Sequence, residues 1–424
     1  MKPFHPVPPL RAARAVLAAT LLGLLASHAA LAQSERWVAS WGTAQLTPSP
    51  DQALPADAWR DGSIRQLVRA SAPGRQVRVR LSNAHGPTPL QINAASVGLV
   101  AANGKPDLVP GSVYPLTFNG ETAVMIPAGA EYLSDPVPLA IAAGADVAIS
   151  LHFLGEPHRV TGHAGSRATT FMLPGNKVLD TTWANPRTAE RWVFITGLEV
   201  LAPKGSRSFV AIGDSITDGY GVKADTHLRW TDGVATRLRE AGLSQIGVVN
   251  AGIGGGRMLR EGLGPALVSR FERDVLMRPG VSHALVFIGV NDMGSQRRNG
   301  DDTPDARARM LADLKLAHTQ LAARAHDQGV CLIGATVTPY AGSDYYRPSP
   351  ANEADRQALN DWIRKSGVFD AVADFDAAVR DPARPDRLAP ESDNDGLHPS
   401  MAGLKKLADA VPLDALRSCR WAAR

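Results

Sequence analysis

The chain has 424 residues, 44% of them hydrophobic and 20% charged, and a formal net charge of +4. This length is sufficient for two domains that each bury a hydrophobic core, which is typical of an enzyme rather than of a small binding module. The small net charge and the lack of a basic run interleaved with aromatic residues argue against nucleic acid as a partner.

The first 32 residues have the pattern of a cleavable export signal. An apolar run over residues 15–26 is preceded by three basic residues, Lys2, Arg11 and Arg14. A small-x-small sequence ends at Ala32, so we expect a signal peptide over residues 1–32 and a periplasmic or secreted mature chain beginning at Gln33. A membrane anchor is the alternative, but the run is shorter than the ~20 apolar residues that span a bilayer, and no later segment approaches that length.

Residues 33–203 have the pattern of β-strands. Hydrophobic residues recur at every second position over residues 77–81 and 147–153, and Gly, Pro and Asn separate such runs. Long helical patterns are absent. We therefore predict an accessory domain of antiparallel strands, a β-sandwich or jelly roll.

The tryptophans of this segment leave two interpretations open. Five are in question: Trp37, Trp41, Trp59, Trp183 and Trp192. Their flat faces could bind sugar rings, as in a carbohydrate-binding module, but tryptophans of β-sandwiches more often fill the core, and we favour the core. His163 is expected near the junction of the two domains, and nothing in its sequence context assigns it to a site.

From residue 204 to residue 424 the sequence pattern changes to strands that are each followed by a helix. Short apolar runs precede helical patterns at residues 209–212, 246–249, 284–288, 332–337 and 368–372. This alternation predicts an α/β domain with a parallel sheet flanked by helices on both faces, a flavodoxin-like three-layer sandwich. Segments that follow the strands would then share the carboxyl edge of the sheet, where ligands bind.

Four short segments of this domain supply the parts of serine acyl transfer. They are residues 213–219 (GDSITDG), 252–256 (GIGGG), 289–292 (GVND) and 395–398 (DGLH). A serine hydroxyl is a weak nucleophile that needs a neighbouring base. Ser215 is the candidate nucleophile, His398 the base that takes its proton, and Asp395 the acid that orients the imidazole.

The oxyanion that forms during attack needs hydrogen-bond donors aimed at it. We assign three: the backbone N–H of Ser215, the backbone N–H of Gly255 and the side-chain amide of Asn291. Gly252 and Gly254 are alternatives to Gly255. Three aspartates are expected to bind nearby backbone N–H groups rather than to take part in catalysis: Asp214, Asp218 and Asp292.

Each segment taken alone has another interpretation. Ser215 could be a helix N-cap. The glycine segment could begin a dinucleotide-binding fingerprint, although Arg257 stands where the third glycine should be. Asp395 and His398 could bind a metal, but no third ligand occurs in a known spacing. The occurrence of all four segments favours catalysis with neither a cofactor nor a metal.

The four segments resemble, in type and order, those of the SGNH hydrolase superfamily, also called the GDSL esterases and lipases, over residues 207–415. The resemblance implies the SGNH fold and an ester hydrolase whose triad is Ser215, His398 and Asp395. A β-rich segment that begins Trp-Val-Ala-Ser-Trp before such a domain resembles a subgroup of secreted arylesterases and carbohydrate acylesterases. This implies substrates with short acyl groups, acetyl above all, on carbohydrate or on small aryl or alkyl alcohols.

Two functions other than ester hydrolysis stay open. The first is an acyltransferase that uses the same site, and the second is a polysaccharide-binding protein whose hydrolase domain is inert. The sequence indicates no oligomeric state. Export would permit a disulfide between the two cysteines, Cys331 and Cys419. Their spacing does not say whether their Cα atoms approach within ~7 Å, so a bridge and two free thiols are both open.

Overall fold

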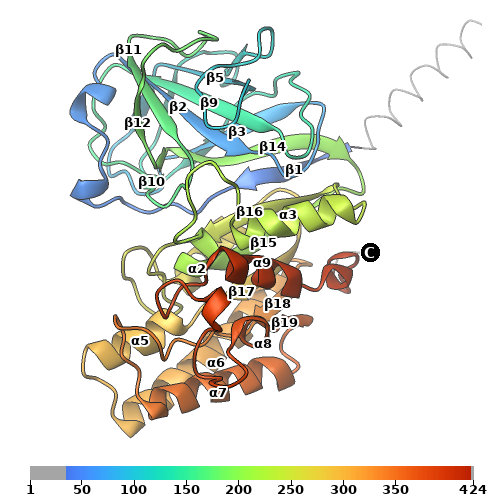
Figure 1. The fold of residues 1–424 in the computed structure, drawn as a ribbon. Helices are drawn as coiled ribbons and strands as arrows, with labels where there is room; N and C mark the ends of the chain where they lie inside the picture. The colour runs from blue at the N-terminus through green and yellow to red at the C-terminus, as the bar shows by residue number, and fades with distance from the viewer. Residues whose placement is uncertain (1–34, 422–424) are drawn as a thin grey trace, which may run out of the picture.

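The computed structural model describes residues 35–421 (Figure 1). The predicted signal peptide, residues 1–32, lies outside the described residues. Between Glu35 and Trp421, no helix combines the length and the apolarity needed to cross a membrane. An antiparallel β-rich region lies above an α/β region in the view of Figure 1, which confirms the predicted fold class.

The β-rich region contains two main antiparallel sheets. The first has the order β1 (Glu35–Gly42), β14 (Ile195–Pro203), β3 (Val77–Ser82) and β8 (Glu131–Leu133). The second has the order β12 (Arg187–Ala189), β11 (Thr170–Pro174), β2 (Gly62–Arg69), β9 (Asp146–Phe153), β5 (Ala94–Leu99) and β6 (Tyr114–Pro115). Two short pairs join β10 (Gly162–His163) to β13 (Trp192–Val193) and β4 (Leu90–Ile92) to β7 (Val124–Ile126).

The period-2 pattern explains how these sheets pack as a sandwich. Val77, Val79 and Leu81 of β3 are fully buried in a core that the other sheet shares. The arginines between them lie on the opposite face, where Arg78 and Arg80 donate to Glu199 of β14 at 2.6 and 2.7 Å. Along β3, every second side chain therefore packs in the core, and the side chains between them form a cross-strand ion-pair cluster.

The tryptophans of this region are packing residues. Trp41, Trp59 and Trp192 lie in the main core, and Trp183 lies in a smaller cluster. The guanidinium of Arg65 covers the Trp183 ring at 4.1 Å, and that of Arg78 covers the partly buried Trp37 ring at 4.4 Å. The favoured interpretation is confirmed for Trp41, Trp59, Trp183 and Trp192, because a buried ring presents no open flat face for sugar stacking.

The α/β region is built on a five-stranded parallel sheet. Its order is β16 (Ile246–Gly252), β15 (Arg207–Gly213), β17 (Val281–Phe287), β18 (Cys331–Ala335) and β19 (Ala371–Ala373). Numbered along the chain, this is the order 2-1-3-4-5 of flavodoxin-like folds. The sheet predicted from the apolar runs is therefore confirmed.

Helices cover both faces of this sheet. One face packs against α3 (Trp230–Glu240), α8 (Phe375–Val379) and α9 (Met401–Ala410). The other packs against α4 (Leu267–Phe271), its π-helical continuation η3 (Glu272–Leu276), α5 (Val290–Arg298), α6 (Pro304–Asp327) and α7 (Pro350–Lys365). Along β15, Phe209 and Ala211 belong to the first core, whereas Val210 and Ile212 belong to the second. Residues 209–212 of this strand are buried on both faces and are therefore apolar without interruption.

The two regions are joined along β1 and β16, which lie next to each other in Figure 1. Thr43 forms a parallel bridge with Asn250, and the backbone N–H of Ala39 donates to the hydroxyl of Ser208 at 3.0 Å. Leu46 lies in the same apolar cluster as Ile253. The contact is thus a continuation of the hydrophobic core rather than a flexible link.

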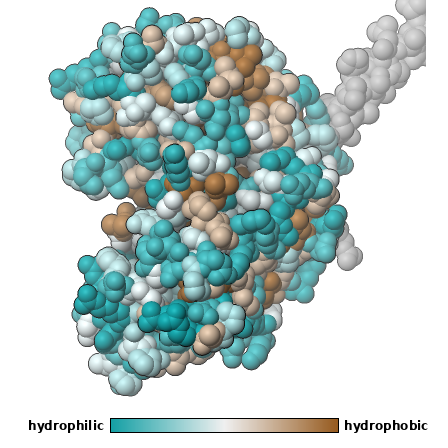
Figure 2. Space-filling model, viewed as in Figure 1, coloured by the Kyte–Doolittle hydropathy of each residue, from teal (hydrophilic) through white to brown (hydrophobic). Residues whose placement is uncertain are grey.

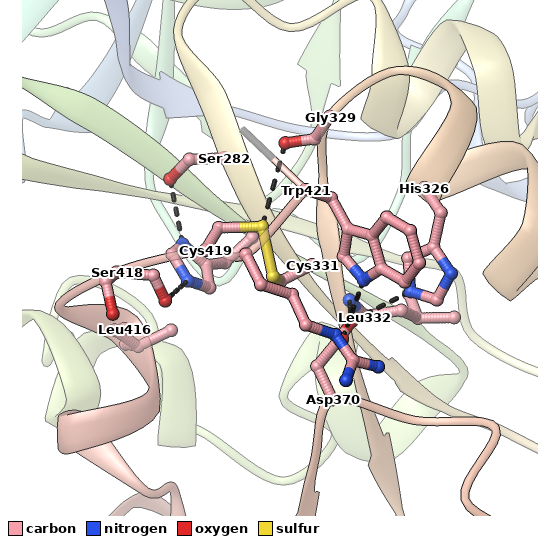
Figure 3. Close-up of a disulfide and its surroundings, with 12 residues drawn as sticks. Ser282, His326, Gly329, Cys331, Leu332, Asp370, Leu416, Ser418, Cys419 and Trp421 are labelled. Carbon is pink, nitrogen blue, oxygen red and sulfur yellow. Dashed lines mark hydrogen bonds and ion pairs between the residues drawn. A yellow bond between two sulfur atoms is a disulfide. The ribbon is translucent and has the colours of Figure 1, made fainter. Parts of the chain in front are cut away.

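A disulfide between Cys331 and Cys419 fixes the end of the chain to β18, with the Cα atoms 5.5 Å apart (Figure 3). Beside it, Asp370 accepts from the indole N–H of Trp421 at 2.8 Å and from the guanidinium of Arg420 at 3.0 Å. The Trp421 ring stacks on His326 with ring centroids 4.1 Å apart. The structure therefore selects the bridge over two free thiols. His283 lies near both sulfurs, but atoms joined in a disulfide are not thiolate ligands for a metal.

Candidate active site

The four sequence segments meet at the carboxyl edge of the parallel sheet. Ser215 follows β15 and begins the short helix α2 (Ser215–Asp218), the glycine segment follows β16, and Asn291 lies in the first turn of α5 after β17. Because β16 and β17 flank β15, these segments are neighbours in space. His398 lies in the loop before α9. The arrangement places the site at the point where the strand order reverses, which is the usual position for ligands in such sheets.

The side chains of Ser215, His398 and Asp395 form a continuous hydrogen-bonded row. The Ser215 hydroxyl oxygen lies 2.9 Å from Nε2 of His398, and Nδ1 of His398 lies 2.8 Å from a carboxylate oxygen of Asp395. A carboxylate only accepts, so Nδ1 carries the proton and Nε2 is free to accept from the serine. The spatial convergence expected from the sequence is therefore present.

A tight loop holds the Asp395–His398 pair. The second carboxylate oxygen of Asp395 accepts from the backbone N–H of Leu397 at 3.1 Å and of His398 at 2.8 Å. Gly396 has a positive φ of 78°, and a Cβ there would lie 2.1 Å from the carbonyl oxygen of Gly342. This position therefore needs glycine, both for its conformation and for the close approach of the backbone.

The three expected oxyanion donors face the same space. Within residues 35–421, the backbone N–H groups of Ser215 and Gly255 have no acceptor. The Asn291 amide nitrogen donates to the carbonyl of Gly256 at 2.8 Å, which leaves its second hydrogen free. Of the two alternatives to Gly255, the structure removes Gly252, because its N–H donates to the side chain of Asn250 at 2.9 Å.

Tyr346, which the sequence analysis did not identify, fixes the orientation of the Asn291 amide. Its phenol donates to Oδ1 of Asn291 at 2.7 Å. Burial raises the pKa of Tyr346 to about 12, so the phenol stays protonated and can donate. Its ring fits against α5 because residue 294 is glycine, where a Cβ would lie 2.5 Å from the ring.

The site tunes the pKa values of its ionisable groups. Burial lowers the pKa of His398 below its ordinary value of 6.5; the hydrogen bond and charge of Asp395 raise it, and the nearby charge of Arg167 lowers it further. Burial disfavours the charged form of Asp395, but hydrogen bonds from the backbone and imidazole of His398 keep the pKa of Asp395 below its ordinary value. His398 is therefore neutral, and able to act as a base, around neutral pH.

The neighbouring aspartates are structural, with one correction to the expectation. Asp214 accepts from the backbone N–H of Ile216 at 3.0 Å, and Asp292 accepts from that of Met258 at 2.8 Å, as expected. Burial raises the pKa of Asp214 to about 7 and that of Asp292 to about 6. The expectation for Asp218 was wrong, because its carboxylate instead lies 2.8 Å from Nε2 of His163 in the β-rich region.

His163 therefore connects the two regions directly behind the serine. Its Nδ1 lies 2.9 Å from the carbonyl oxygen of Ala44, and both His163 and Asp218 are buried. Both ring nitrogens of His163 therefore have an oxygen partner, one in each region of the chain. No sequence motif could have revealed this pair, because its members belong to different regions of the chain.

Both regions line an open cleft of about 1440 Å³ in front of Ser215. The β-rich region contributes residues such as Leu46 and Arg167, and the α/β region contributes Tyr220 and Leu263. The ring of Tyr220 stacks on the imidazole of His398 with centroids 3.9 Å apart. Figure 2 shows the surface hollowed between the two regions. The shape and lining fit an organic ester that reaches the serine from this side.

Comparison with known proteins identifies the α/β region. Residues 211–406 match the model of the GDSL-like Lipase/Acylhydrolase family. The α/β region therefore contains a GDSL-like lipase/acylhydrolase domain. This match supports ester hydrolysis as the activity. No curated protein matches the sequence.

Several solved structures are similar to this GDSL-like region. An acetylxylan esterase from Geobacillus stearothermophilus is 22% identical, with 51% of this chain and 96% of that chain covered and a TM-score of 0.37. An alpha/beta hydrolase enzyme from the metagenome of Lake Arreo is 20% identical, with 49% and 94% covered and a TM-score of 0.36. A GDSL-like lipase from Bacteroides thetaiotaomicron is 18% identical, with 50% and 88% covered and a TM-score of 0.36.

Proposed function

We propose that this protein is a serine esterase that hydrolyses short-chain carboxylic esters through an acyl-enzyme on Ser215. The observation that carries the proposal is the row Ser215–His398–Asp395, which ends beside two unoccupied backbone N–H groups in an open cleft. Each group needed for acyl transfer has a counterpart in this row and its surroundings. The family of the α/β region supports the same reaction class.

The proposed cycle has two halves. Ser215 attacks the ester carbonyl while Nε2 of His398 takes the hydroxyl proton, and Asp395 stabilises the imidazolium that results. The N–H groups of Ser215 and Gly255 and the amide of Asn291 bind the oxyanion. The intermediate collapses, His398 returns the proton to the departing alcohol, and the acyl group stays on Ser215. Water, activated by His398, then attacks the acyl-enzyme and releases the acid.

The substrates that we propose are acetyl or other short acyl esters of carbohydrate, or small aryl and alkyl esters. The cleft is open rather than a tunnel, so a bulky alcohol portion can remain outside it. Polar residues also line it, among them Gln52, Ser343 and Asn394, which suits an alcohol rich in hydroxyls. We further propose that the chain acts outside the cytoplasm, and the disulfide supports this, because disulfides persist in oxidising compartments.

The test is a panel of p-nitrophenyl esters from acetate to palmitate, together with acetylated xylan, on wild type and Ser215→Ala. We expect turnover that falls steeply beyond butyrate and acetate release from xylan, both abolished by Ser215→Ala. Ser366→Ala removes a serine hydroxyl outside the cleft and should leave the rates unchanged. Mass spectrometry of a rapidly quenched reaction should find the acyl group on the peptide that contains Ser215.

Other outcomes would contradict this proposal. Binding to acetylated xylan with no turnover of any ester would support an inert hydrolase domain. Acyl transfer to glycerol that exceeds hydrolysis would identify an acyltransferase. Equal rates for wild type and Ser215→Ala would exclude Ser215 as the nucleophile.

A further inference from the structure

A loop of the β-rich region forms part of the cleft, and contacts from the α/β region fix its position. We name residues 163–169 the crossing loop. Three residues of the α/β region hold it: Asp218, Asp225 and Arg229. The first pairs with the imidazole of His163, and the guanidinium of Arg229 donates to the carbonyl of Ser166. The loop therefore has one defined position relative to the serine.

Asp225 fixes the end of the crossing loop that contains Arg167. The backbone N–H of Asp225 donates to the carbonyl of Arg167 at 3.0 Å, and its carboxylate accepts from the N–H of Thr169 at 2.8 Å. Arg167 itself has a φ of +47°, in the left-handed region that favours glycine. Such strained residues cluster at functional sites, where the side chain is needed in one place.

The guanidinium of Arg167 lies over the Tyr220 ring, next to the catalytic base His398. It is 5.8 Å from the centroid of the Tyr220 ring, which also stacks on the imidazole of His398. Within residues 35–421 the Arg167 side chain makes no hydrogen bond and no ion pair, and its Nε atom is buried. A guanidinium has five N–H donors, so this one is free to bind a ligand in the cleft.

Three arginines line the cleft, and three of the four lining acids already have hydrogen-bond partners. Arg384 and Arg387 also line it; Arg384 lies 3.7 Å from Asp381, which is outside the lining, and Arg387 forms no ion pair with residues 35–421. Two of the lining acids already have imidazole partners: Asp218 pairs with His163 and Asp395 with His398. A third, Asp393, accepts from the backbone N–H of Gly396 at 2.6 Å, and Asp344 is exposed. The arginines thus have fewer free acidic partners than the lining suggests.

We propose that Arg167 binds a carboxylate of the substrate, so that the preferred esters are those whose acyl or alcohol portion carries a carboxylate close to the ester bond. Bidentate pairing of guanidinium with carboxylate fixes both position and orientation. The inference deepens the proposed esterase function and rests on it. It makes the β-rich region the source of a specificity-determining residue rather than a separate binding module.

The test compares matched charged and neutral esters. For the acyl side, the substrates are mono-p-nitrophenyl glutarate and p-nitrophenyl butyrate; for the alcohol side, they are O-acetylated galacturonate and O-acetylated galactose. Arg167→Gln should lower kcat/KM for the better charged substrate by about tenfold or more, mainly through KM, because charge-assisted hydrogen bonds are lost. The matched neutral ester should change by less than about threefold, and Arg167→Lys should retain part of the preference.

The controls separate the possible failures. Arg309→Gln removes an exposed arginine of α6 outside the cleft and should leave the preference unchanged. An equal loss on charged and neutral esters would give Arg167 a structural role and overturn the proposal, as would an unchanged preference. If Arg167→Gln does not fold, inhibition of wild-type hydrolysis of p-nitrophenyl acetate tests the proposal instead. Free glutarate should inhibit competitively and glutaramide should not. Equal inhibition by the two compounds would overturn the proposal. No turnover of any ester by wild type would instead contradict the proposed function.

Discussion

The phenol of Tyr346 donates a hydrogen bond of 2.7 Å to Oδ1 of Asn291. An amide can present either its oxygen or its nitrogen to a site, and this bond assigns the oxygen to Tyr346. The nitrogen is then left for the carbonyl of Gly256 and for the cleft. Tyr346 is thereby a positioning residue for a proposed oxyanion donor.

Tyr346→Phe removes this donor and keeps the ring that packs beside Gly294. We expect kcat for p-nitrophenyl acetate to fall by about fivefold to thirtyfold with KM nearly unchanged, because the amide is less well oriented in the transition state. The matched background is Asn291→Ala, which should itself lower kcat by about 100-fold to 1000-fold. In that background Tyr346→Phe should have little further effect, and a fully additive loss would show that Tyr346 acts elsewhere.

The acidic limb of the kcat/KM profile should report the pKa of His398. The base must be neutral to accept a proton, so activity rises with pH through this pKa and reaches a plateau above it. Burial and Arg167 lower the pKa and Asp395 raises it, with a net shift downward, so the midpoint should lie below 6.5. The other groups against the imidazole are the aromatic ring of Tyr220 and the hydroxyl of Ser215.

The variant Arg167→Gln tests the predicted direction of the His398 pKa shift. Loss of a nearby positive charge stabilises the imidazolium, so the acidic limb should move to higher pH. The measurement is kcat/KM for neutral p-nitrophenyl acetate across acidic and neutral buffers. A limb that moves to lower pH, or a wild-type midpoint above 6.5, would contradict the assignment.

The buried pair His163–Asp218 should contribute to stability as well as to the position of the crossing loop. His163→Ala leaves the carboxylate of Asp218 buried without its partner, and we expect the free energy of unfolding to fall by about 3–5 kcal/mol. Urea denaturation checks this value. Adding Asp218→Asn to His163→Ala should recover part of the loss, and no recovery would mean that lost packing, not the unpaired charge, is the cause.

The disulfide should stabilise the chain by closing a loop of 88 residues. Replacing both cysteines by alanine should lower the free energy of unfolding by about 2–4 kcal/mol, mainly because the unfolded chain gains freedom. The bridge lies at β18 and outside the lining of the cleft, so kcat for p-nitrophenyl acetate should stay the same. A variant with normal stability, or one with a large loss of kcat at temperatures where it is folded, would contradict this expectation.

Local patterns in the sequence were sufficient to predict the fold class and the groups that meet at the site. The alternation in β3 and the continuous apolar run in β15 each follow from how many faces of a strand are buried. Asp395 and His398 are three residues apart in one loop, so their pairing is a local property of the chain. The order of the four segments could be read directly from residues 213 to 398.

Only the tertiary structure decided which side chains meet across long separations. Ser215 and His398 are 183 positions apart, and the bond from Tyr346 to Asn291 spans 55. No sequence pattern indicated that Asp218 would pair with His163 or that Arg167 would reach the cleft, and the sequence left a bridge and two free thiols equally open for the cysteines. The physical reason is that periodicity and turn residues specify the local path of the backbone, whereas these contacts depend on how the sheet and the sandwich pack against each other.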